Sequence, residues 1–184
     1  MELGGICMNN TLFHSLEGEK LKFKQMITKD SEVVHGFASD PDVSRFIGWP
    51  LTRSLEETKD YVEKMIRRDE SGSHIYANII DKSTNELIGT AMVFNFDEAA
   101  KHAEIGYVFH KDVWGRGFCT ETVKLICDFA FNELGLHKLH AQVNAANIGS
   151  SRVLEKNGFE LEGRLRDYHF VDGQYYDSLF YGKL

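Results

Sequence analysis

The chain has 184 residues, which is long enough to bury a sizeable core and most simply forms one domain. Its content of 42% hydrophobic and 27% charged residues is ordinary for a soluble globular protein. The formal net charge of −7 argues against broad binding to nucleic acids or anionic membranes, and it mildly favours a cationic substrate.

The N-terminal segment gives no targeting signal. Residues 1–19 contain neither Lys nor Arg, and no apolar run in the chain is long enough to span a bilayer. We therefore expect a cytoplasmic protein that does not bind membranes. Residues 1–18 are interpreted as an N-terminal extension, either loose or an edge strand, ahead of a single domain over residues 19–184.

Metal-ligand spacing is missing from the sequence. Its three cysteines are an odd number, and its eight histidines are scattered without partner spacing. Cys127 falls on an apolar helix face, where a small core residue is the better interpretation. We expect no metal cofactor and a reducing compartment.

The first third of the chain predicts one strand followed by helices. Asp40 and Pro41 combine an N-cap with a proline at the first helical position, and Ser54 to Glu57 forms a capping box. We predict a strand over residues 20–27, weak helical spacing over residues 29–39, a short helix from Pro41 through Phe46, and a longer helix from Leu55 to near Gly72.

The remainder alternates strands with helices. The predicted elements are strands over residues 75–80, 87–96 and 103–109, a helix closed by Gly135, a strand over residues 139–143, a helix over residues 150–157, and a hairpin of residues 161–171 and 174–184 that turns at Asp172-Gly173. The short helix is capped by either Asn147 or Gly149. This order predicts a mixed α/β fold of the α+β type.

The glycine turn between the third strand and the long helix is a candidate anion site. Gly115 and Gly117 lack a Cβ that would keep a phosphate from the backbone, and Arg116 lies between them. The free N–H groups of the first helical turn and the helix dipole favour negative charge there. An ordinary tight turn is the alternative interpretation.

Two familiar nucleotide motifs do not fit this turn. A P-loop needs Lys and then Ser or Thr after its last glycine, whereas Phe118 and Cys119 follow here. A dinucleotide fingerprint needs a third glycine where Thr120 stands. Both classes of site are therefore excluded, and an oxidoreductase that uses a nucleotide cofactor is disfavoured.

Several motifs, taken in order, resemble the GNAT superfamily of N-acetyltransferases, and within it the RimJ/RimL-like group that acetylates ribosomal-protein N-termini. The resemblance covers about residues 20–184. It rests on Glu104-Ile105-Gly106-Tyr107, on Trp114 through Glu121, on Asn147-Ile148-Gly149-Ser150 and Arg152 through Lys156 with Gly158-Phe159, and on Glu162-Gly163 with Gly173 and Asp177 in the hairpin.

The resemblance implies a mixed, mostly antiparallel sheet of about seven strands that splays between strands 4 and 5, with acetyl-CoA as cosubstrate in the splay. It implies that the pantetheine lies beside the backbone of Tyr107, Val108 and Phe109. It implies that the pyrophosphate binds the backbone amides of Arg116, Gly117, Phe118, Cys119 and Thr120. The second wall of the cofactor site would hold Asn147 and Ser150.

The sequence departs from the superfamily at Leu154. Many members have a tyrosine at this position, where it serves as general acid toward the departing thiolate, and Leu154 cannot donate a proton. Ser150 is the candidate that orients or protonates the thiolate, although a hydroxyl at a helix start also caps the helix. Asn147 has the same two interpretations, as a cap and as a contact to CoA.

Glu104 is the candidate general base. It lies in an apolar strand, with opposite parity to Ala103, Ile105 and Tyr107, so an outward-facing structural residue is the alternative. The functional hypothesis places its carboxylate at the mouth of the splay, where it takes the proton of the attacking amine directly or through water.

The predicted function is transfer of an acetyl group from acetyl-CoA to a primary amine by direct attack in a ternary complex. The resemblance favours a peptide α-amine, such as a ribosomal-protein N-terminus. Polyamine or antibiotic acetylation and a non-catalytic acyl-CoA-binding sensor are the alternatives. No nucleic acid partner is expected, and association into a homo-oligomer stays open.

Overall fold

A single mixed sheet organises the chain. The computed structural model describes residues 10–47, 52–171 and 173–184. In this part of the chain the strand order is β1-β2-β3-β4-β5-β7-β6. The strands are β1 (Leu21–Lys24), β2 (Ile75–Asp81), β3 (Leu87–Asp97), β4 (His102–Phe109), β5 (Lys138–Asn144), β6 (Glu160–Val171) and β7 (Gln174–Lys183).

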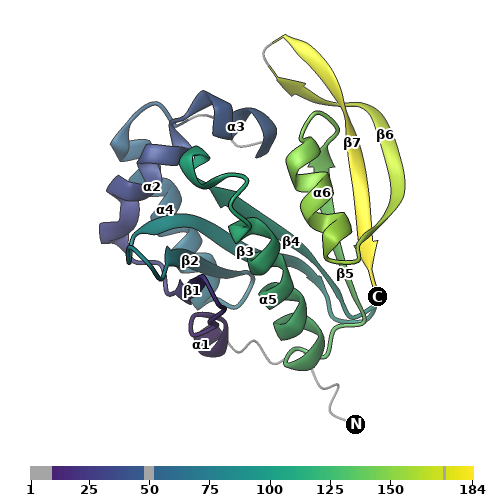
Figure 1. Cartoon of the computed structure of the whole chain (residues 1–184), viewed down its shortest axis with the longest axis horizontal. Coiled ribbons are helices and arrows are strands. Elements are labelled where there is room, and N and C mark those ends of the chain that lie inside the picture. Colours follow the sequence, from purple (N-terminus) through teal and green to yellow (C-terminus); the bar gives the residue numbers. More distant parts are fainter. Residues whose placement is uncertain (1–9, 48–51, 172) are drawn as a thin grey trace.

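Helices cover both faces of the sheet (Figure 1). They are α1 (Asn10–Phe13), α2 (Ser31–Ala38), α3 (Pro41–Ile47), α4 (Leu55–Glu70), α5 (Phe118–Asn132) and α6 (Ile148–Lys156). Short 3-10 turns lie at Thr28–Asp30 and Lys111–Val113. The β6–β7 hairpin extends beside α6, away from β1 (Figure 1). The predicted α/β fold with a sheet of about seven strands is confirmed.

Alternation along β4 divides the core into two parts. Ala103, Ile105 and Phe109 pack in the larger cluster with α5, whereas Val108 points to the other face and packs in the smaller cluster with α2 and α4. This is the two-residue period expected of a strand that is covered on both sides. The core therefore packs against β4 from both sides.

One strand pair differs from all the others in the described sheet. β4 and β5 run parallel, and they pair only from His102 to Glu104, opposite Lys138 to His140. The other neighbouring strands are antiparallel and pair over longer stretches. Past Glu104, β4 and β5 therefore diverge. The predicted splay between the fourth and fifth strands is present.

The first predicted strand is longer than the observed one, whereas the next predicted segment is helical as expected. The first strand covers only Leu21–Lys24 instead of residues 20–27. The Asp30 carboxylate accepts hydrogen bonds from the Ile27 N–H and the Asn78 side chain, at 2.9 and 2.6 Å, and draws the chain out of the sheet. The weak helical spacing over residues 29–39 becomes α2.

Residues 10–18 are packed more tightly than expected. Asn10–Phe13 form α1, where we predicted a loose segment or an edge strand. Phe13 is fully buried, and its ring contacts the rings of Phe23 and Phe129, each with centroids 5.1 Å apart. Residues 1–9 of the predicted extension and the predicted helix break at Trp49-Pro50 lie outside the described residues, as does Asp172 of the predicted turn.

The predicted caps and helix ends are largely confirmed. The Ser54 side chain accepts from the Glu57 N–H at 3.2 Å at the start of α4, and Gly72 follows its end with a positive φ of 72°. Asn147, rather than Gly149, caps α6. The hairpin has nearly the predicted strands.

Candidate active site

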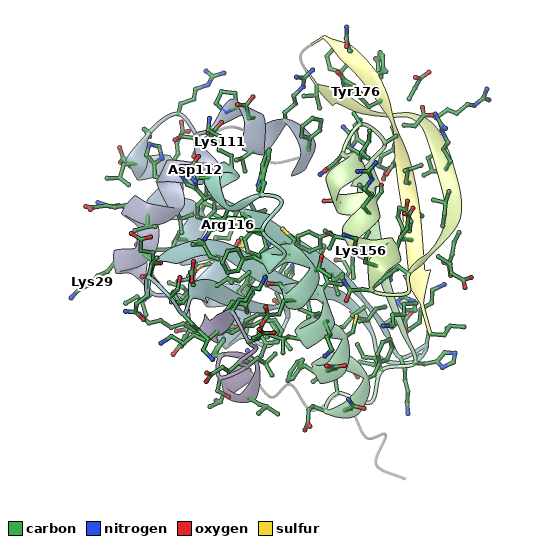
Figure 2. All side chains as sticks on the ribbon, viewed as in Figure 1. Lys29, Lys111, Asp112, Arg116, Lys156 and Tyr176 are labelled. Atoms are coloured by element: carbon green, nitrogen blue, oxygen red, sulfur yellow. The ribbon has the colours of Figure 1, made fainter. Side chains whose placement is uncertain are left out.

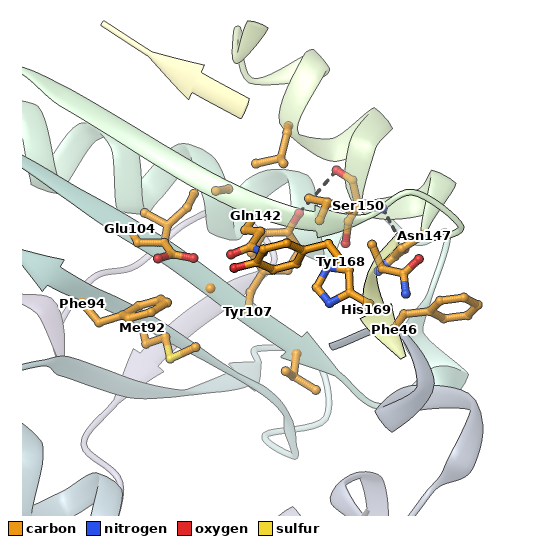
Figure 3. Close-up of a pocket in the computed structure, with 17 residues that line it drawn as sticks. Phe46, Met92, Phe94, Glu104, Tyr107, Gln142, Asn147, Ser150, Tyr168 and His169 are labelled. Atoms are coloured by element: carbon orange, nitrogen blue, oxygen red, sulfur yellow. Dashed lines mark hydrogen bonds between the residues drawn. The ribbon is translucent and has the colours of Figure 1, made fainter. Parts of the chain in front are cut away.

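The splay opens a cavity between β4 and β5. β4 remains paired with β3 as far as Phe109, and β5 remains paired with β7 as far as Asn144. Between them lies a cavity of about 330 Å³. Its walls come from β3, β4, β5, α3, α6 and the hairpin, through residues that include Phe46, Phe94, Glu104, Tyr107, Val108, Gln142, Asn147, Ser150, Leu154, Tyr168 and His169. Figure 3 shows Glu104 at one end of this cavity and Asn147 at the other.

Glu104 lies where the splay begins, at the last position of β4 that pairs with β5. Its Oε2 accepts a hydrogen bond from the Asn95 side chain at 2.8 Å and lies 3.7 Å from Nε2 of His140. The side chain is mostly buried. The residue lines the cavity and does not point into open solvent.

A bulge in β3 places Asn95. Phe94 pairs with Glu104 and Asp97 pairs with His102, so the register shifts between them. Asn95 has a left-handed backbone, with φ of 51°, which asparagine tolerates better than most residues. This conformation directs its side chain at Glu104. The sequence analysis missed Asn95, because the bulge interrupts the two-residue alternation without leaving a motif.

The Tyr107 hydroxyl lies on the other side of the cavity, 3.5 Å from the backbone carbonyl of Ser150 (Figure 3). Burial raises the pKa of this hydroxyl above its ordinary value, so the phenol stays protonated at neutral pH. Tyr107 was predicted for its backbone alone. Its side chain adds an O–H donor to a cavity in which Leu154, fully buried, supplies none.

The start of α6 forms the second predicted wall. The Asn147 side chain accepts from the Ser150 N–H at 3.1 Å, so Asn147 is a helix cap and also lines the cavity. The cap uses only the Asn147 Oδ1 atom. The Asn147 NH2 group and the Ser150 hydroxyl can therefore form hydrogen bonds with a ligand in the cavity.

The glycine turn has the backbone that its sequence requires. Gly115 and Gly117 have φ of 74° and 88°, in the left-handed region that favours glycine, and Gly117 is the N-cap of α5. Trp114 anchors the turn to β4, because its indole N–H donates to the Phe109 carbonyl at 3.1 Å. Arg116, labelled in Figure 2, is exposed, and its guanidinium lies over the ring of Phe118.

A second cavity, of about 500 Å³, lies beside this turn. Its walls carry Glu19, Lys20, Asp81, Lys82, Ser83, Arg116 and Phe118. Lys20 Nζ donates to the Arg116 carbonyl at 3.2 Å, which brings a second cation to the turn. The predicted cofactor residues thus divide between two cavities, with Tyr107, Val108, Asn147 and Ser150 in one and Arg116 and Phe118 in the other.

The remaining predicted residues lie in neither cavity wall. Phe109 is buried and Gly117 forms the cap, as described above. Thr120 sits in the first turn of α5, and its carbonyl accepts from the Asn157 side chain at 3.2 Å. Burial raises the pKa of the Cys119 thiol to about 12, so it stays a neutral, weakly reactive thiol.

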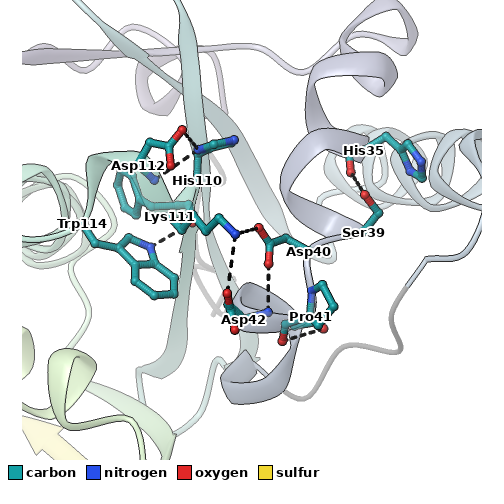
Figure 4. Close-up of polar contacts among 11 residues, drawn as sticks. His35, Ser39, Asp40, Pro41, Asp42, His110, Lys111, Asp112 and Trp114 are labelled. Atoms are coloured by element: carbon teal, nitrogen blue, oxygen red, sulfur yellow. Dashed lines mark hydrogen bonds and ion pairs between the residues drawn. The ribbon is translucent and has the colours of Figure 1, made fainter.

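Helix α3 forms the outer wall of the cavity through Phe46. Lys111 Nζ holds the start of α3, at 2.8 Å from Asp40 Oδ2 and 3.5 Å from Asp42 Oδ2 (Figure 4). Arg45 on α3 donates to the hydroxyl of Tyr176 on β7 at 3.5 Å. The end of β4 and the hairpin therefore both fix the position of this wall.

The described residues offer neither a metal-binding group nor a helix that could span a membrane. No three His, Cys, Asp or Glu side chains come together there in a group that could hold a metal ion. Among the same residues, no helix has the length and apolar character needed to cross a membrane.

Comparison with known proteins agrees with this geometry. The sequence profile of the acetyltransferase (GNAT) domain matches residues 20–160. The chain is 30% identical over 170 residues to the uncharacterized N-acetyltransferase p20 of Bacillus licheniformis, covering 92% of this chain and 96% of that protein.

Two solved structures share the fold at 20% identity. One is the ribosomal L7/L12 α-N-protein acetyltransferase RimL in complex with coenzyme A, with a TM-score of 0.83 over 92% of this chain and 97% of that one. The other is a spermidine N-acetyltransferase from Vibrio cholerae in complex with CoA and spermine, with a TM-score of 0.81 over 91% of this chain and 96% of that one.

Proposed function

The chain belongs to the GNAT family of acetyltransferases, and we propose that it transfers the acetyl group of acetyl-CoA to the α-amine of a peptide chain. Both substrates would be bound together, and the amine would attack the thioester directly. The observation that carries this proposal is the divergence of β4 and β5 directly after the Glu104–His140 pair.

The splay supports the placement of the acyl donor. The edge of β4 that faces β5 has no strand partner past Glu104 within the described sheet. Its backbone N–H and C=O groups therefore need partners, and an extended pantetheine with two amides supplies them as an added strand would. The N–H groups at the start of α5 and the cations of Arg116 and Lys20 suit the pyrophosphate.

The two faces of the splay support a division of chemical roles. Glu104 lies on one side and can take a proton from the amine. The hydroxyl groups of Tyr107 and Ser150 lie on the other side, where they can donate hydrogen bonds to the departing thiolate. Attack by the amine from the Glu104 side, with departure of the CoA thiolate toward α6, would fit a thioester that lies between β4 and β5.

The charge of the cavity supports a monocationic acceptor. Glu104 is the single carboxylate among the described residues that line it. A polyamine carries two or more cations, and one carboxylate cannot pair with them all. The acetyltransferases compared above act on a ribosomal protein in one case and bind spermine in the other, so the fold alone accommodates both acceptors.

The free-energy cost of deprotonating the acceptor also favours an α-amine. An α-amine with a pKa near 8 costs about 1.4 kcal/mol to deprotonate at pH 7, whereas a lysine-like amine near 10.4 costs about 4.6 kcal/mol. The single carboxylate is held by a neutral amide, Asn95, and lies near one imidazole. Such a site suits the amine that loses its proton more easily. Such a reaction would draw on the acetyl-CoA of the cytoplasm.

A panel of acceptors tests this proposal. Release of free CoA thiol is measured with acetyl-CoA and, separately, a short peptide with a free α-amine, the same peptide with an acetylated N-terminus, spermidine and an aminoglycoside. We expect thiol release with the free peptide and none with its capped control. Release with spermidine or the aminoglycoside alone would make the acceptor a small molecule, and acetyl-CoA binding without release in any case would indicate a sensor.

A further inference from the structure

A row of polar side chains leads from Glu104 to the molecular surface. His140 Nε2 lies 3.7 Å from Glu104 Oε2, and the ring of His140 meets the ring of His102 edge to face, with centroids 5.3 Å apart. His102 Nε2 lies 3.8 Å from Asp97 Oδ2. Exposed fractions of the side chains rise along the row, from 16% for Glu104 through 24% for His140 and 34% for His102 to 48% for Asp97.

The strand register builds this row. In the short parallel pair, Glu104 lies opposite His140, and His102 lies opposite Lys138. Residues two apart on a strand share a face, so His102 stands beside Glu104. The bulge in β3 then brings Asp97 opposite His102. The row therefore depends on the one place where β4 and β5 pair.

Acetyl transfer to a charged amine requires such a route. At neutral pH the acceptor arrives mainly as an ammonium ion. One N–H proton must be removed to free the lone pair that attacks the carbonyl carbon. When the C–S bond breaks, a second N–H proton ends on sulfur and gives the CoA thiol. The first proton is left over, and it must leave the base before the next turnover.

We propose that His140 is the positioning residue that accepts this proton from Glu104 and passes it toward His102 and solvent. The inference rests on the proposed function. Asn95 also contacts Glu104 Oε2, but its NH2 group donates this hydrogen bond and is not basic enough to take up the proton. An imidazole nitrogen can both accept and release a proton, so His140 is the neighbour of Glu104 with the required chemistry.

The other charged groups near His140 are engaged elsewhere or lie further along the row. Lys138 Nζ bonds both carboxylate oxygens of Glu162, at 2.7 and 2.6 Å, so these two charges neutralise each other. Gly182 of β7 pairs with His140 and brings no side chain. The charged and titratable groups near the ring include Glu104 and His102 on β4, Asp97 on β3, Lys138 on β5, and Glu160 and Glu162 on β6.

The test compares His140→Gln with His137→Gln, an exposed histidine on the loop before β5. The turnover number and both KM values are measured from pH 6 to pH 9 with acetyl-CoA and a short peptide with a free α-amine. For His140→Gln we expect turnover at pH 7 to fall about tenfold or more. The loss should shrink as the pH approaches the amine's own pKa, while the KM for acetyl-CoA stays unchanged. His137→Gln should match the wild type throughout.

A second variant separates proton transfer from folding. In His140→Ala, added imidazole should restore part of the turnover at pH 7, and N-methylpyrrole, which cannot accept a proton, should not. A loss that is equal at all pH values and insensitive to imidazole would overturn the inference while leaving the acetyltransferase intact. A wild-type protein that acetylates no amine would overturn the proposed function and this inference together.

Discussion

At the residue scale, the surroundings of Glu104 support its proposed role as general base. Its carboxylate lines the cavity, and Asn95 fixes one oxygen at 2.8 Å. A glutamate that only filled the last paired position between β4 and β5 would not need the hydrogen bond from Asn95, which the bulge in β3 makes possible. The orientation of the carboxylate by a neutral donor is the arrangement expected of a base whose position matters.

The first prediction is that Glu104→Gln slows acetyl transfer at neutral pH by about 10²-fold or more. Glutamine keeps the shape of the side chain and removes its basicity. Partial recovery should appear as the pH rises, because the amine then loses its proton unaided. The measurement is the turnover number between pH 6.5 and 9. Wild-type turnover between pH 6.5 and 7.5 would make Glu104 structural.

The second prediction concerns the two hydroxyl groups near α6. Tyr107→Phe removes one oxygen atom and keeps the partly buried ring, so the fold should be preserved. We expect this variant to lower turnover by about tenfold or more, with little change in acetyl-CoA affinity, because the donor acts on charge that develops during the reaction. Turnover and the dissociation constant of acetyl-CoA are measured together.

Ser150→Ala is the matched comparison for Tyr107→Phe. If Ser150 also serves the thiolate, its loss should likewise lower turnover more than affinity. Unchanged turnover in Ser150→Ala beside a loss in Tyr107→Phe would assign the role to the tyrosine. Wild-type turnover in both variants would leave water as the proton donor.

At the element scale, local chemistry explains which features the sequence predicted. Gly115 and Gly117 were identifiable because the left-handed backbone of such a turn favours glycine, which the sequence shows directly. Asn147 was identifiable because a helix start needs a cap. Asn95 and His140 were not identifiable. Their roles depend on a bulge and on a three-residue parallel register between distant segments, which no local spacing records.

Helix α1 shows a different limit. Residues 10–13 are too few to display a helical period, and their placement depends on the packing of Phe13 against Phe23 and Phe129. Isolated helices of this length are unstable in water, so tertiary contacts decide their structure. The splay itself was expected only from family resemblance, because β4 and β5 both read as ordinary strands.

The third prediction tests the turn that starts α5. Gly117→Asp should abolish acetyl-CoA binding, because it places a carboxylate where the pyrophosphate is expected. Gly117→Asn is the matched control, since asparagine has nearly the same shape and tolerates the left-handed φ of 88° better than most residues. It should weaken binding far less. Equal affinities of the two folded variants would refute this placement of the pyrophosphate.

At the scale of the whole molecule, several carboxylates link stability to pH. The pKa of Asp40 is lowered by its bond to Lys111, that of Asp81 by the Ser83 hydroxyl, and that of Asp177 by the Asp167 N–H and by Arg164. Each pKa lies below its ordinary value of 3.8, so the unfolded chain binds protons more readily than the folded one.

The fourth prediction is that stability falls as the pH drops below about 4. The stabilisation is fully present above the ordinary value of 3.8 and is lost as the pH passes through the lowered folded-state pKa values. Thermal unfolding between pH 6 and 2.5 measures the effect. The melting temperature of the Asp177→Asn variant should depend less steeply on pH in this range. A melting temperature that is constant from pH 5 to 2.5 would contradict the account.

The central claim is that a thioester bound in the splay between β4 and β5 acetylates a peptide α-amine. The most direct measurement uses one peptide that carries both a free α-amine and a lysine side chain, treated with acetyl-CoA and the protein at pH 7. Tandem mass spectrometry then locates the acetyl group. We predict acetylation of the α-nitrogen, and its loss in Glu104→Gln. Acetylation of the lysine side chain alone, or an untouched peptide beside acetylated spermidine, would contradict the claim.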